Sequence, residues 1–517
     1  MERAKRRRQT HKNRHPAPVE NVLSGWVDTV HELNIIRLND DGDGVARLED
    51  VTVFVPGALP GETVHARIVS AHKRHLVAEA TGWVLRHESG WHGEGSDGHE
   101  GSQDEGSQDE GSRDQALADH ISQGQASADQ GHPIRVAPLC PVFHQCGGCQ
   151  LQHLSYSTAL EHKRQVVANA LQRIGHLDKC EVLPTIGMDT PWRYRNQIQV
   201  PLRYDADSGQ LVQGFFAPHS HEVIETTSCD LVPPSVEETM VEAPRQMSRV
   251  LGAEASVVHH MIIRHSLFTG EQMLILGVRK PPADLKKLTT ALFSPSIVSL
   301  GITVQENPTG PVWGDKVDII AGKANLMERL GKLDFLISPR SFFQVNTKQA
   351  DVLTELARNS CALRGDEVVL DAYCGTGTFS LTIANSVKEI VGIEAVAPAV
   401  EDARANAKQN SIDNARFEVG IVEHVLPRWV EQGTRFDVAV LDPPRKGCHP
   451  DVLRALVDAG IPRIVYVSCN PATLARDVRI LADAGYRPGA FQPVDMFPQT
   501  SHVECVILMT RKQKIEM

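Results

Sequence analysis

Two polar residues at the ends of apolar runs are the strongest candidates for chemistry in this sequence. Cys469 follows the run RIVYVS and precedes PATLARDVRILADAG, which has the pattern of a helix with Pro471 in its first turn. Unpaired N–H groups at a helix start favour a thiolate, so we expect this position to lower the pKa of Cys469. Asp442 follows the run DVAVL. A lone cysteine at a strand end is more often a small core residue, so the neighbouring motifs must decide whether it is a nucleophile.

A glycine-rich turn indicates a nucleoside cofactor. The apolar run VVL leads into DAYCGTG, where Gly375 and Gly377 allow a tight turn with backbone N–H groups close to a ligand. A second run ends at Glu394, 17 residues beyond Gly377, where a carboxylate can accept both ribose hydroxyls. The turn lacks both the GxGxxG spacing and the P-loop lysine, which favours S-adenosylmethionine over NAD. The alternative interpretation of Glu394 is an ordinary surface acid.

Four cysteines have a spacing that suits a metal centre. Cys140, Cys146 and Cys149 form a compact group, and Cys229 can supply a fourth thiolate. Four thiolates suit zinc or an iron–sulfur cluster, and spacing alone does not choose between them. The alternative, unliganded core cysteines, is disfavoured by the compactness of the group.

The pattern of strand-like and helical segments that must position these residues predicts a multidomain α/β protein. Strand-like runs alternate with helical segments over residues 338–517, which predicts a doubly wound, Rossmann-like domain. Residues 135–337 alternate strand-like runs with turns and indicate a central mixed α/β module that includes the four cysteines. Short alternating runs with Gly-rich turns over residues 21–86 predict a small β-barrel of OB-like architecture.

The net charge of −11 does not exclude a nucleic-acid partner, because it is concentrated in one segment. Residues 88–129 hold 11 acidic residues and one basic residue, within EGSQD repeats too poor in apolar residues to fold. We therefore interpret residues 87–134 as an acidic low-complexity linker that activity does not require. Residues 1–20 form a basic tail, expected to be disordered, which either contacts nucleic acid or only aids solubility.

Localisation is expected to be cytoplasmic. No apolar run reaches the 18 or so residues of a membrane span, and no apolar segment follows the basic start. The sequence has ten cysteines and shows no secretion signal. We therefore expect the cysteines to be metal ligands, nucleophiles or core residues and not to form disulfides. We expect no membrane association, and no obligate protein partner is evident.

Six motifs in order resemble the bacterial RNA uracil-5-methyltransferases: SFFQVN (341–346), DAYCGTGTF (371–379), GIEAV (392–396), LDPPRKG (441–447), YVSCNPATLARD (466–477) and DMFPQTSHVECVIL (495–508). The segment GDGVARLEDVTVFVPGALPGETVHARI resembles the TRAM domain, an RNA-binding barrel. With the cysteine group, it resembles the 23S rRNA branch of the family, whereas the similar tRNA uracil-54 enzymes are expected to lack both features.

The resemblance implies a covalent mechanism, with Cys469 as nucleophile and Glu504 as base. Uracil C5 is a poor nucleophile, and addition of a thiolate to C6 makes C5 able to attack a sulfonium methyl group. A base must then remove the C5 proton so that the cysteine can leave. Asp442 matches the family's site carboxylate, which helps to place cofactor and base near the thiol.

The resemblance also implies the ligand-binding residues. A [4Fe–4S] cluster is expected on Cys140, Cys146, Cys149 and Cys229. The expected S-adenosylmethionine contacts are Gln344, Tyr373, Gly375, Gly377, Thr378, Glu394 and Asp442. In one departure, the position aligned with an adenine-contacting acidic or amide residue is Ile421, which has no polar side-chain atom. Either the alignment is displaced by one or two residues, or a backbone group makes this contact.

Three other functions remain open at this stage. The first is a tRNA uridine-5-methyltransferase. The second is an exocyclic-amino methyltransferase, disfavoured because Arg445 stands where an aromatic would stack on the base and because that chemistry does not use Cys469. The third is an RNA-binding iron–sulfur protein without activity, disfavoured by the intact set of Cys469, Glu504 and Asp442.

Overall fold

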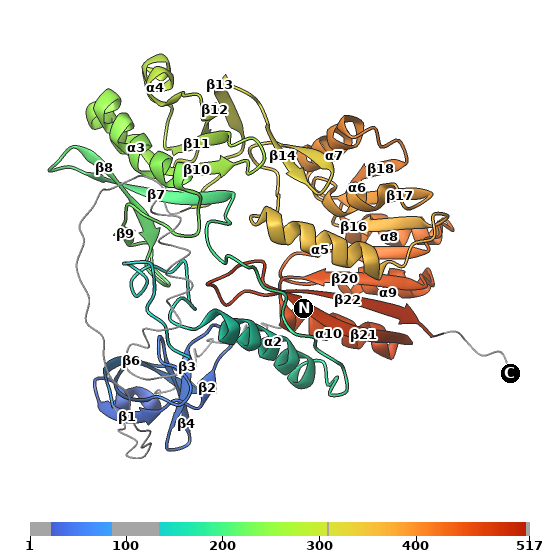
Figure 1. Cartoon of the computed structure of the whole chain (residues 1–517), viewed down its shortest axis with the longest axis horizontal. Coiled ribbons are helices and arrows are strands. Elements are labelled where there is room, and N and C mark those ends of the chain that lie inside the picture. The colour runs from blue at the N-terminus through green and yellow to red at the C-terminus, as the bar shows by residue number, and fades with distance from the viewer. Residues whose placement is uncertain (1–21, 85–133, 308–309, 513–517) are drawn as a thin grey trace, which may run out of the picture. The chain divides into compact units, whose positions relative to one another are not determined.

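The computed structural model describes residues 22–84, 134–307 and 310–512, which belong to two units that are described separately (Figure 1). The predicted basic tail and residues 87–133 of the predicted acidic linker lie outside the described residues. Among the described residues, no helix has both the length and the apolar content that crossing a membrane requires.

The N-terminal unit is a six-stranded sheet that curls around one apolar core. Buried residues alternate along its longest strands, as in Val64, Ala66 and Ile68, because successive side chains of a strand point to opposite faces. The strand order is β1-β5-β6-β4-β3-β2, and β1 also contacts β3. This arrangement agrees with the small β-barrel predicted for residues 21–86. Its elements are η1 (Val22–Trp26), β1 (Val30–Asn34), β2 (Arg37–Leu38), β3 (Gly44–Leu48), β4 (Val51–Val55), β5 (Thr63–Ala71) and β6 (His75–Trp83).

A seven-stranded mixed sheet forms the central module, in the order β13-β12-β11-β10-β7-β8-β9. Apolar residues of α3 and α4 share a core with its strands, which confirms the mixed α/β character expected here. Its elements are β7 (Gln197–Asp205), β8 (Gln210–Phe216), β9 (Val223–Glu225), α3 (Pro234–Leu251), η3 (Gly252–Val257), β10 (Val258–His265), β11 (Gln272–Val278), α4 (Leu285–Leu292), β12 (Ile297–Val304) and β13 (Val317–Gly322).

The C-terminal domain is built on a second seven-stranded sheet, in the order β18-β17-β16-β19-β20-β22-β21. The first five strands of that order are parallel, and β22 and β21 are antiparallel to their neighbours. This is the doubly wound domain that the alternating pattern predicts. Its strands are β16 (Val368–Ala372), β17 (Glu389–Glu394), β18 (Ala415–Val419), β19 (Val438–Leu441), β20 (Arg463–Ser468), β21 (Tyr486–Val494) and β22 (Glu504–Arg511).

Two apolar cores, one on each face, hold the helices against this sheet. One core contains residues of α8 (Val422–Glu431), α9 (Pro450–Asp458) and α10 (Pro471–Asp483). The other contains residues of α5 (Thr347–Ser360), α6 (Thr378–Ala384), α7 (Ala397–Gln409) and the hairpin of β14 (Leu326–Leu330) and β15 (Leu333–Ile337).

Helix α2 (Tyr156–Arg173) packs on the C-terminal domain, although its sequence position groups it with the central module. Its residues Val167, Ala170 and Leu171 belong to the same core as α10. The chain that follows also bridges to β21, at Val182 and Ile186. Part of the segment that precedes the central sheet therefore supports the C-terminal sheet.

Candidate active site

The carboxyl ends of the parallel strands open into a cavity of about 700 Å³, a typical size for a small-molecule site. Its walls come from the segments that follow β16, β17, β19 and β20, from the start of α8, and from the loop before β22. Open α/β sheets bind ligands at this edge because the loops there converge.

Strand register brings the three predicted catalytic residues together. Ser468 of β20 pairs with Cys505 of β22, so the antiparallel register places Cys469 opposite Glu504. Asp442 follows β19, which lies on the other side of β20. All three side chains line the same cavity. The predicted grouping of thiol, base and carboxylate is thus present in the structure.

The expectation that the helix start lowers the pKa of Cys469 is wrong. Burial, then the charges of Glu504 and Asp442, raise the pKa of the Cys469 thiol to about 11, and Arg445 only partly opposes this. The N–H groups at the start of α10 are not directed to the thiol, because the Asn470 side chain accepts those of Ala472 and Thr473, at 3.0 and 3.4 Å.

The pKa values of the two carboxyl groups, those of Asp442 and Glu504, are both raised. Burial, followed by the charge of Asp371, raises the pKa of Asp442 to about 7. Burial, followed by the charge of Asp442, raises the pKa of Glu504 well above its ordinary value. Since each ionised group opposes ionisation of the others, this cluster disfavours a full set of negative charges unless a cation is nearby.

One cation already faces the cluster. The Arg445 guanidinium lowers the pKa of both Cys469 and Glu504, and its Nη2 lies 3.3 Å from Nε2 of His502. Its backbone is held by Asn470 Nδ2, which donates to the Arg445 carbonyl at 3.0 Å. Arg445 is thus fixed beside the thiol as well as charged.

The raised thiol pKa predicts how Cys469 reacts with iodoacetamide in the unliganded protein. Only the thiolate is alkylated, so the rate should keep rising with pH beyond 9, where an exposed thiol of pKa about 8.5 levels off. Mass spectrometry of the Cys469 peptide gives the rate, with the urea-unfolded chain as control. A plateau below pH 9 in the folded protein would contradict the electrostatics described above.

Four of the expected cofactor contacts beyond Asp442 line this cavity: Gln344, Tyr373, Gly375 and Glu394. Glu394 accepts hydrogen bonds from the Gly375 N–H at 3.2 Å and the Val396 N–H at 2.8 Å, so its carboxylate is held at the end of β17. Because both carboxylate oxygens are held in this way, Glu394 differs from the ordinary surface acid that was the alternative interpretation.

Gly377 and Thr378 do not line the cavity. Gly377 precedes α6 with a φ of +84°, and a Cβ there would lie 3.3 Å from Ala403 and Phe417. The glycine is therefore explained by backbone conformation and packing. Thr378 is the first residue of α6.

Sequence reasoning did not name Glu423, which lies in the first turn of α8 and lines the cavity, although an alignment displaced by two residues from Ile421 reaches it. Ile421, the aligned position, also lines it but offers no polar side-chain atom. The first turn of α8 brings the next carboxylate to the same wall, so a search for any acid within a few residues of FEVG would have found it. Other lining residues that were missed are Phe342, Lys446, Phe497 and His502.

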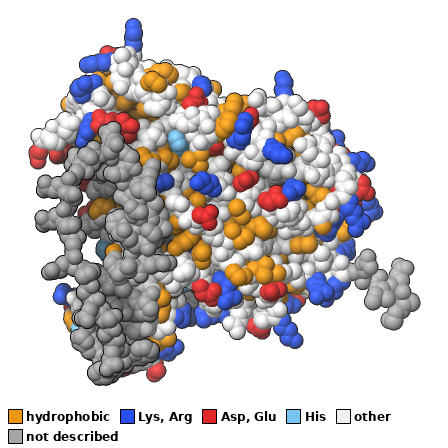
Figure 2. Space-filling view, viewed as in Figure 1, with side chains coloured by type: hydrophobic (Ala, Val, Ile, Leu, Met, Phe, Trp, Pro, Cys, Tyr) orange, Lys and Arg blue, Asp and Glu red, His pale blue; other side chains and the backbone are white. Residues whose placement is uncertain are grey.

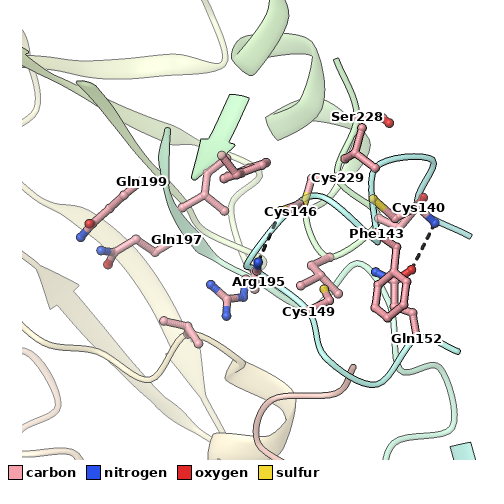
Figure 3. A pocket seen from close by; sticks show the side chains of 17 residues that line it. Cys140, Phe143, Cys146, Cys149, Gln152, Arg195, Gln197, Gln199, Ser228 and Cys229 are labelled. Carbon is pink, nitrogen blue, oxygen red and sulfur yellow. Dashed lines mark hydrogen bonds between the residues drawn. The ribbon is translucent and has the colours of Figure 1, made fainter. Parts of the chain in front are cut away.

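The four predicted metal ligands line a second cavity, of about 310 Å³ (Figure 3). Burial raises the pKa of Cys149 to about 12 and that of Cys229 to about 11. Among the residues that the structure describes, no group of three His, Cys, Asp or Glu side chains is arranged to hold a metal ion. Arg195 also lines this cavity, and its buried Nε has no hydrogen-bond partner.

Two family models match this chain, one in the N-terminal unit and one in the C-terminal domain. Residues 363–473 match a model described as a methyltransferase domain, and residues 28–81 match the TRAM domain. A protein of Halalkalibacterium halodurans named an uncharacterized RNA methyltransferase is 37% identical, over 93% of this chain and 97% of its own length. A Clostridium tetani protein of the same description is 35% identical, over 93% of this chain and 96% of its own length.

A solved structure matches nearly the whole chain. The tRNA (uracil-54, C5)-methyltransferase of Pyrococcus abyssi, in complex with S-adenosyl-L-homocysteine, is 27% identical with a TM-score of 0.67. The match covers 92% of this chain and 99% of that one.

Proposed function

This chain belongs to the RNA methyltransferases that use S-adenosylmethionine, and from that premise we propose that it methylates C5 of a uridine. The observation that carries the proposal is the meeting of Cys469, Glu504 and Asp442 in one cavity. A methyltransferase acting on a nitrogen or a hydroxyl has no need of a thiol there. The similarity to a uracil C5-methyltransferase supports the same reaction.

The proposed reaction uses Cys469 and Glu504 in sequence. The Cys469 thiolate adds to C6 of uracil, forming an S–C6 bond and placing electron density on C5. C5 then bonds to the methyl group as the bond from that methyl to the sulfonium sulfur breaks, which leaves S-adenosylhomocysteine. Glu504 removes the proton from C5, and the electrons of that bond restore the C5–C6 double bond as the S–C6 bond breaks. The thiolate is recovered, and the proton ends on the Glu504 carboxylate.

The residues on the other wall fit S-adenosylmethionine, which supplies a methyl group on a positively charged sulfonium. Each Glu394 oxygen accepts one backbone bond, which leaves lone pairs for ribose hydroxyls. Gln344 and Glu423 offer further polar side chains on the wall. A cation bound beside Asp442 and Glu504 favours their ionised forms, so Glu504 is expected to become a competent base only in the loaded site.

Incubation of the enzyme with RNA and S-adenosylmethionine carrying a labelled methyl group tests this function. Digestion to nucleosides and mass spectrometry should identify 5-methyluridine as the labelled product. A label on a ring nitrogen, an exocyclic amine or a ribose hydroxyl would reject the proposal.

We propose 23S rRNA as the substrate, and the support for it is the sequence resemblance to that branch. The expectation that tRNA uracil-54 enzymes lack the N-terminal barrel does not hold for the P. abyssi enzyme, because its match covers too much of this chain to leave the barrel out. Mapping 5-methyluridine in rRNA and tRNA from cells lacking the protein decides the matter. Loss from 23S rRNA supports our assignment, and loss from tRNA alone rejects it.

We also propose a [4Fe–4S] cluster in the four-cysteine cavity. Four thiolates can bind either zinc or an iron–sulfur cluster, and the support for the cluster is the sequence resemblance to the 23S rRNA branch. A cluster bound by four thiolates is negatively charged, and Arg195 offers a buried cation with an unpaired Nε. The cluster would hold the cysteine segment together, since methyl transfer involves no electron transfer.

Replacing Cys149 with serine is expected to remove this metal centre. Iron content should fall from about four atoms per chain to well below one, and the melting temperature should drop, because metal binding contributes to folding. Metal analysis and thermal unfolding measure both effects, with Cys180→Ser as the matched control that retains iron. Stoichiometric zinc in place of iron in the parent protein would contradict the cluster assignment.

A further inference from the structure

The segment between β21 and β22, residues 495–503, carries part of the active site, and we call it the site loop. Phe497 and His502 line the cavity, and the loop ends directly before Glu504. Val494, the residue before the loop, pairs with Glu504 in the sheet. Asp495 is therefore the neighbour of the residue that pairs with Glu504.

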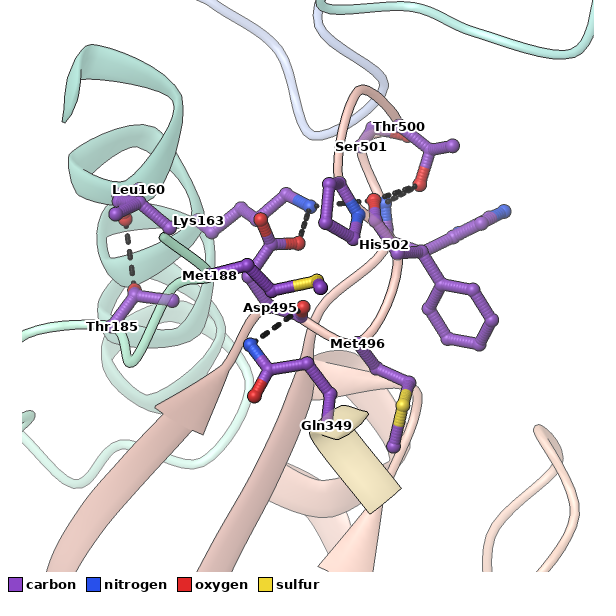
Figure 4. A network of polar contacts seen from close by, with 12 residues as sticks. Leu160, Lys163, Thr185, Met188, Gln349, Asp495, Met496, Thr500, Ser501 and His502 are labelled. Carbon is purple, nitrogen blue, oxygen red and sulfur yellow. Dashed lines mark hydrogen bonds and ion pairs between the residues drawn. The ribbon is translucent and has the colours of Figure 1, made fainter. Parts of the chain in front are cut away.

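Helix α2 holds the base of the site loop through a buried ion pair (Figure 4). Lys163 Nζ lies 2.5 Å from Asp495 Oδ1 and also donates to the Phe497 carbonyl at 3.0 Å. The Tyr156 hydroxyl donates to Asp495 Oδ2 at 2.8 Å. The side chains of Lys163 and Asp495 are each only 1% exposed.

Other segments bind the rest of the loop. Gln150 and Leu151, which follow Cys149, both donate their N–H groups to the Gln499 carbonyl at 3.0 Å. Asn346 Nδ2 donates to the Met496 carbonyl at 3.1 Å, and the Tyr194 hydroxyl donates to the Pro498 carbonyl at 3.0 Å. These four partners are neutral groups, whereas Lys163 supplies a buried charge.

A buried charge restricts the loop more strongly than a neutral hydrogen bond. If the loop left its place, Lys163 would lose both Asp495 and the Phe497 carbonyl, and an unpaired buried charge is costly. Burial holds the pKa of Lys163 below its ordinary value, and the charge and hydrogen bond of Asp495 partly oppose that effect. Nothing in the proposed chemistry requires a lysine on α2. The presence of Lys163 must therefore be explained either by its contribution to stability alone or by its placement of the site loop.

We propose that Lys163 is a positioning residue for the methyl-transfer reaction, acting through Asp495 to fix the site loop and the adjoining Glu504. This rests on the proposed function of the site. Lys163 touches neither the cavity nor the groups that react, so it acts at a distance through the loop.

The test is Lys163→Met, which keeps the length of the side chain and removes its charge. Since small displacements of catalytic groups are costly, kcat should fall about 10- to 100-fold, while the affinity for S-adenosylhomocysteine changes less than about twofold. Because Glu504 acts after the S–C6 bond forms, covalent enzyme–RNA complex should accumulate with ordinary RNA on a denaturing gel. Asp495→Asn, a milder change of the same pair, should show the same pattern if Lys163→Met does not fold.

The matched control is Arg463→Met. It breaks the ion pair of Arg463 with the buried Glu367, 2.9 Å apart, at the opposite end of the strand that leads to Cys469. It should lower stability without accumulating covalent complex. If Lys163→Met and Asp495→Asn behave like this control, the positioning role is wrong. If the parent protein forms no complex even with 5-fluorouridine RNA, the proposed function fails, and the positioning role fails with it.

Discussion

Replacing Cys469 with serine is expected to reduce methyl transfer by at least about 10⁴-fold, because loss of a nucleophile removes the covalent route. A serine hydroxyl ionises even less readily than the thiol, whose pKa is already raised to about 11 by burial and by Glu504 and Asp442. The affinity for S-adenosylhomocysteine should change by less than about threefold, since Glu394 and Gln344 are untouched. Initial rates of labelled-methyl transfer and binding calorimetry measure the two effects.

Cys180→Ser is the matched control for that substitution. Cys180 is a partly buried cysteine that packs against the core beneath α10 and does not line the cavity. It should keep at least half of the parent rate. A Cys469→Ser protein that retained more than a few per cent of the parent rate would exclude nucleophilic catalysis by this residue.

Replacing Glu504 with glutamine is expected to lower turnover by about 10²- to 10⁴-fold, the usual contribution of a general base. It should also change which species accumulates. The substitution removes one of the charges that raise the pKa of Cys469, so addition to C6 is not impeded, while removal of the C5 proton is. Covalent enzyme–RNA complex should build up with ordinary RNA, as seen on a denaturing gel.

Glu418→Gln serves as the control, because Glu418 is an exposed carboxylate on β18 away from the cavity. It should neither slow turnover nor accumulate complex. Should Glu504→Gln turn over at the parent rate without complex, another group must remove the C5 proton.

Much of the fold follows from periodicity in the sequence. The apolar runs before Asp442 and Cys469 form β19 and β20, and the predicted helix after Cys469 is α10. These elements are predictable because buried parallel strands are continuously apolar and amphipathic helices repeat about every 3.6 residues. That Cys469 and Asp442 share one edge follows from strand direction, whereas Glu504 could be placed only by its resemblance to a known motif.

The remaining features depend on contacts between distant segments. Burial of Cys469 in the folded site, followed by the charges of Glu504 and Asp442, raises the pKa of its thiol. Lys163 lies on a helix that otherwise resembles a surface helix, and it is buried because Asp495, 332 residues later, pairs with it. No local pattern reports such a pairing.

Trapping with RNA that contains 5-fluorouridine tests the central claim most directly. Fluorine at C5 cannot be removed as a proton, so the bond between Cys469 and C6 should persist after methyl transfer. With S-adenosylmethionine present, the parent protein should form a stable complex whose RNA-linked peptide contains Cys469, and Cys469→Ala should form none. Absence of the complex in the parent protein, or its presence in Cys469→Ala, would contradict the covalent mechanism.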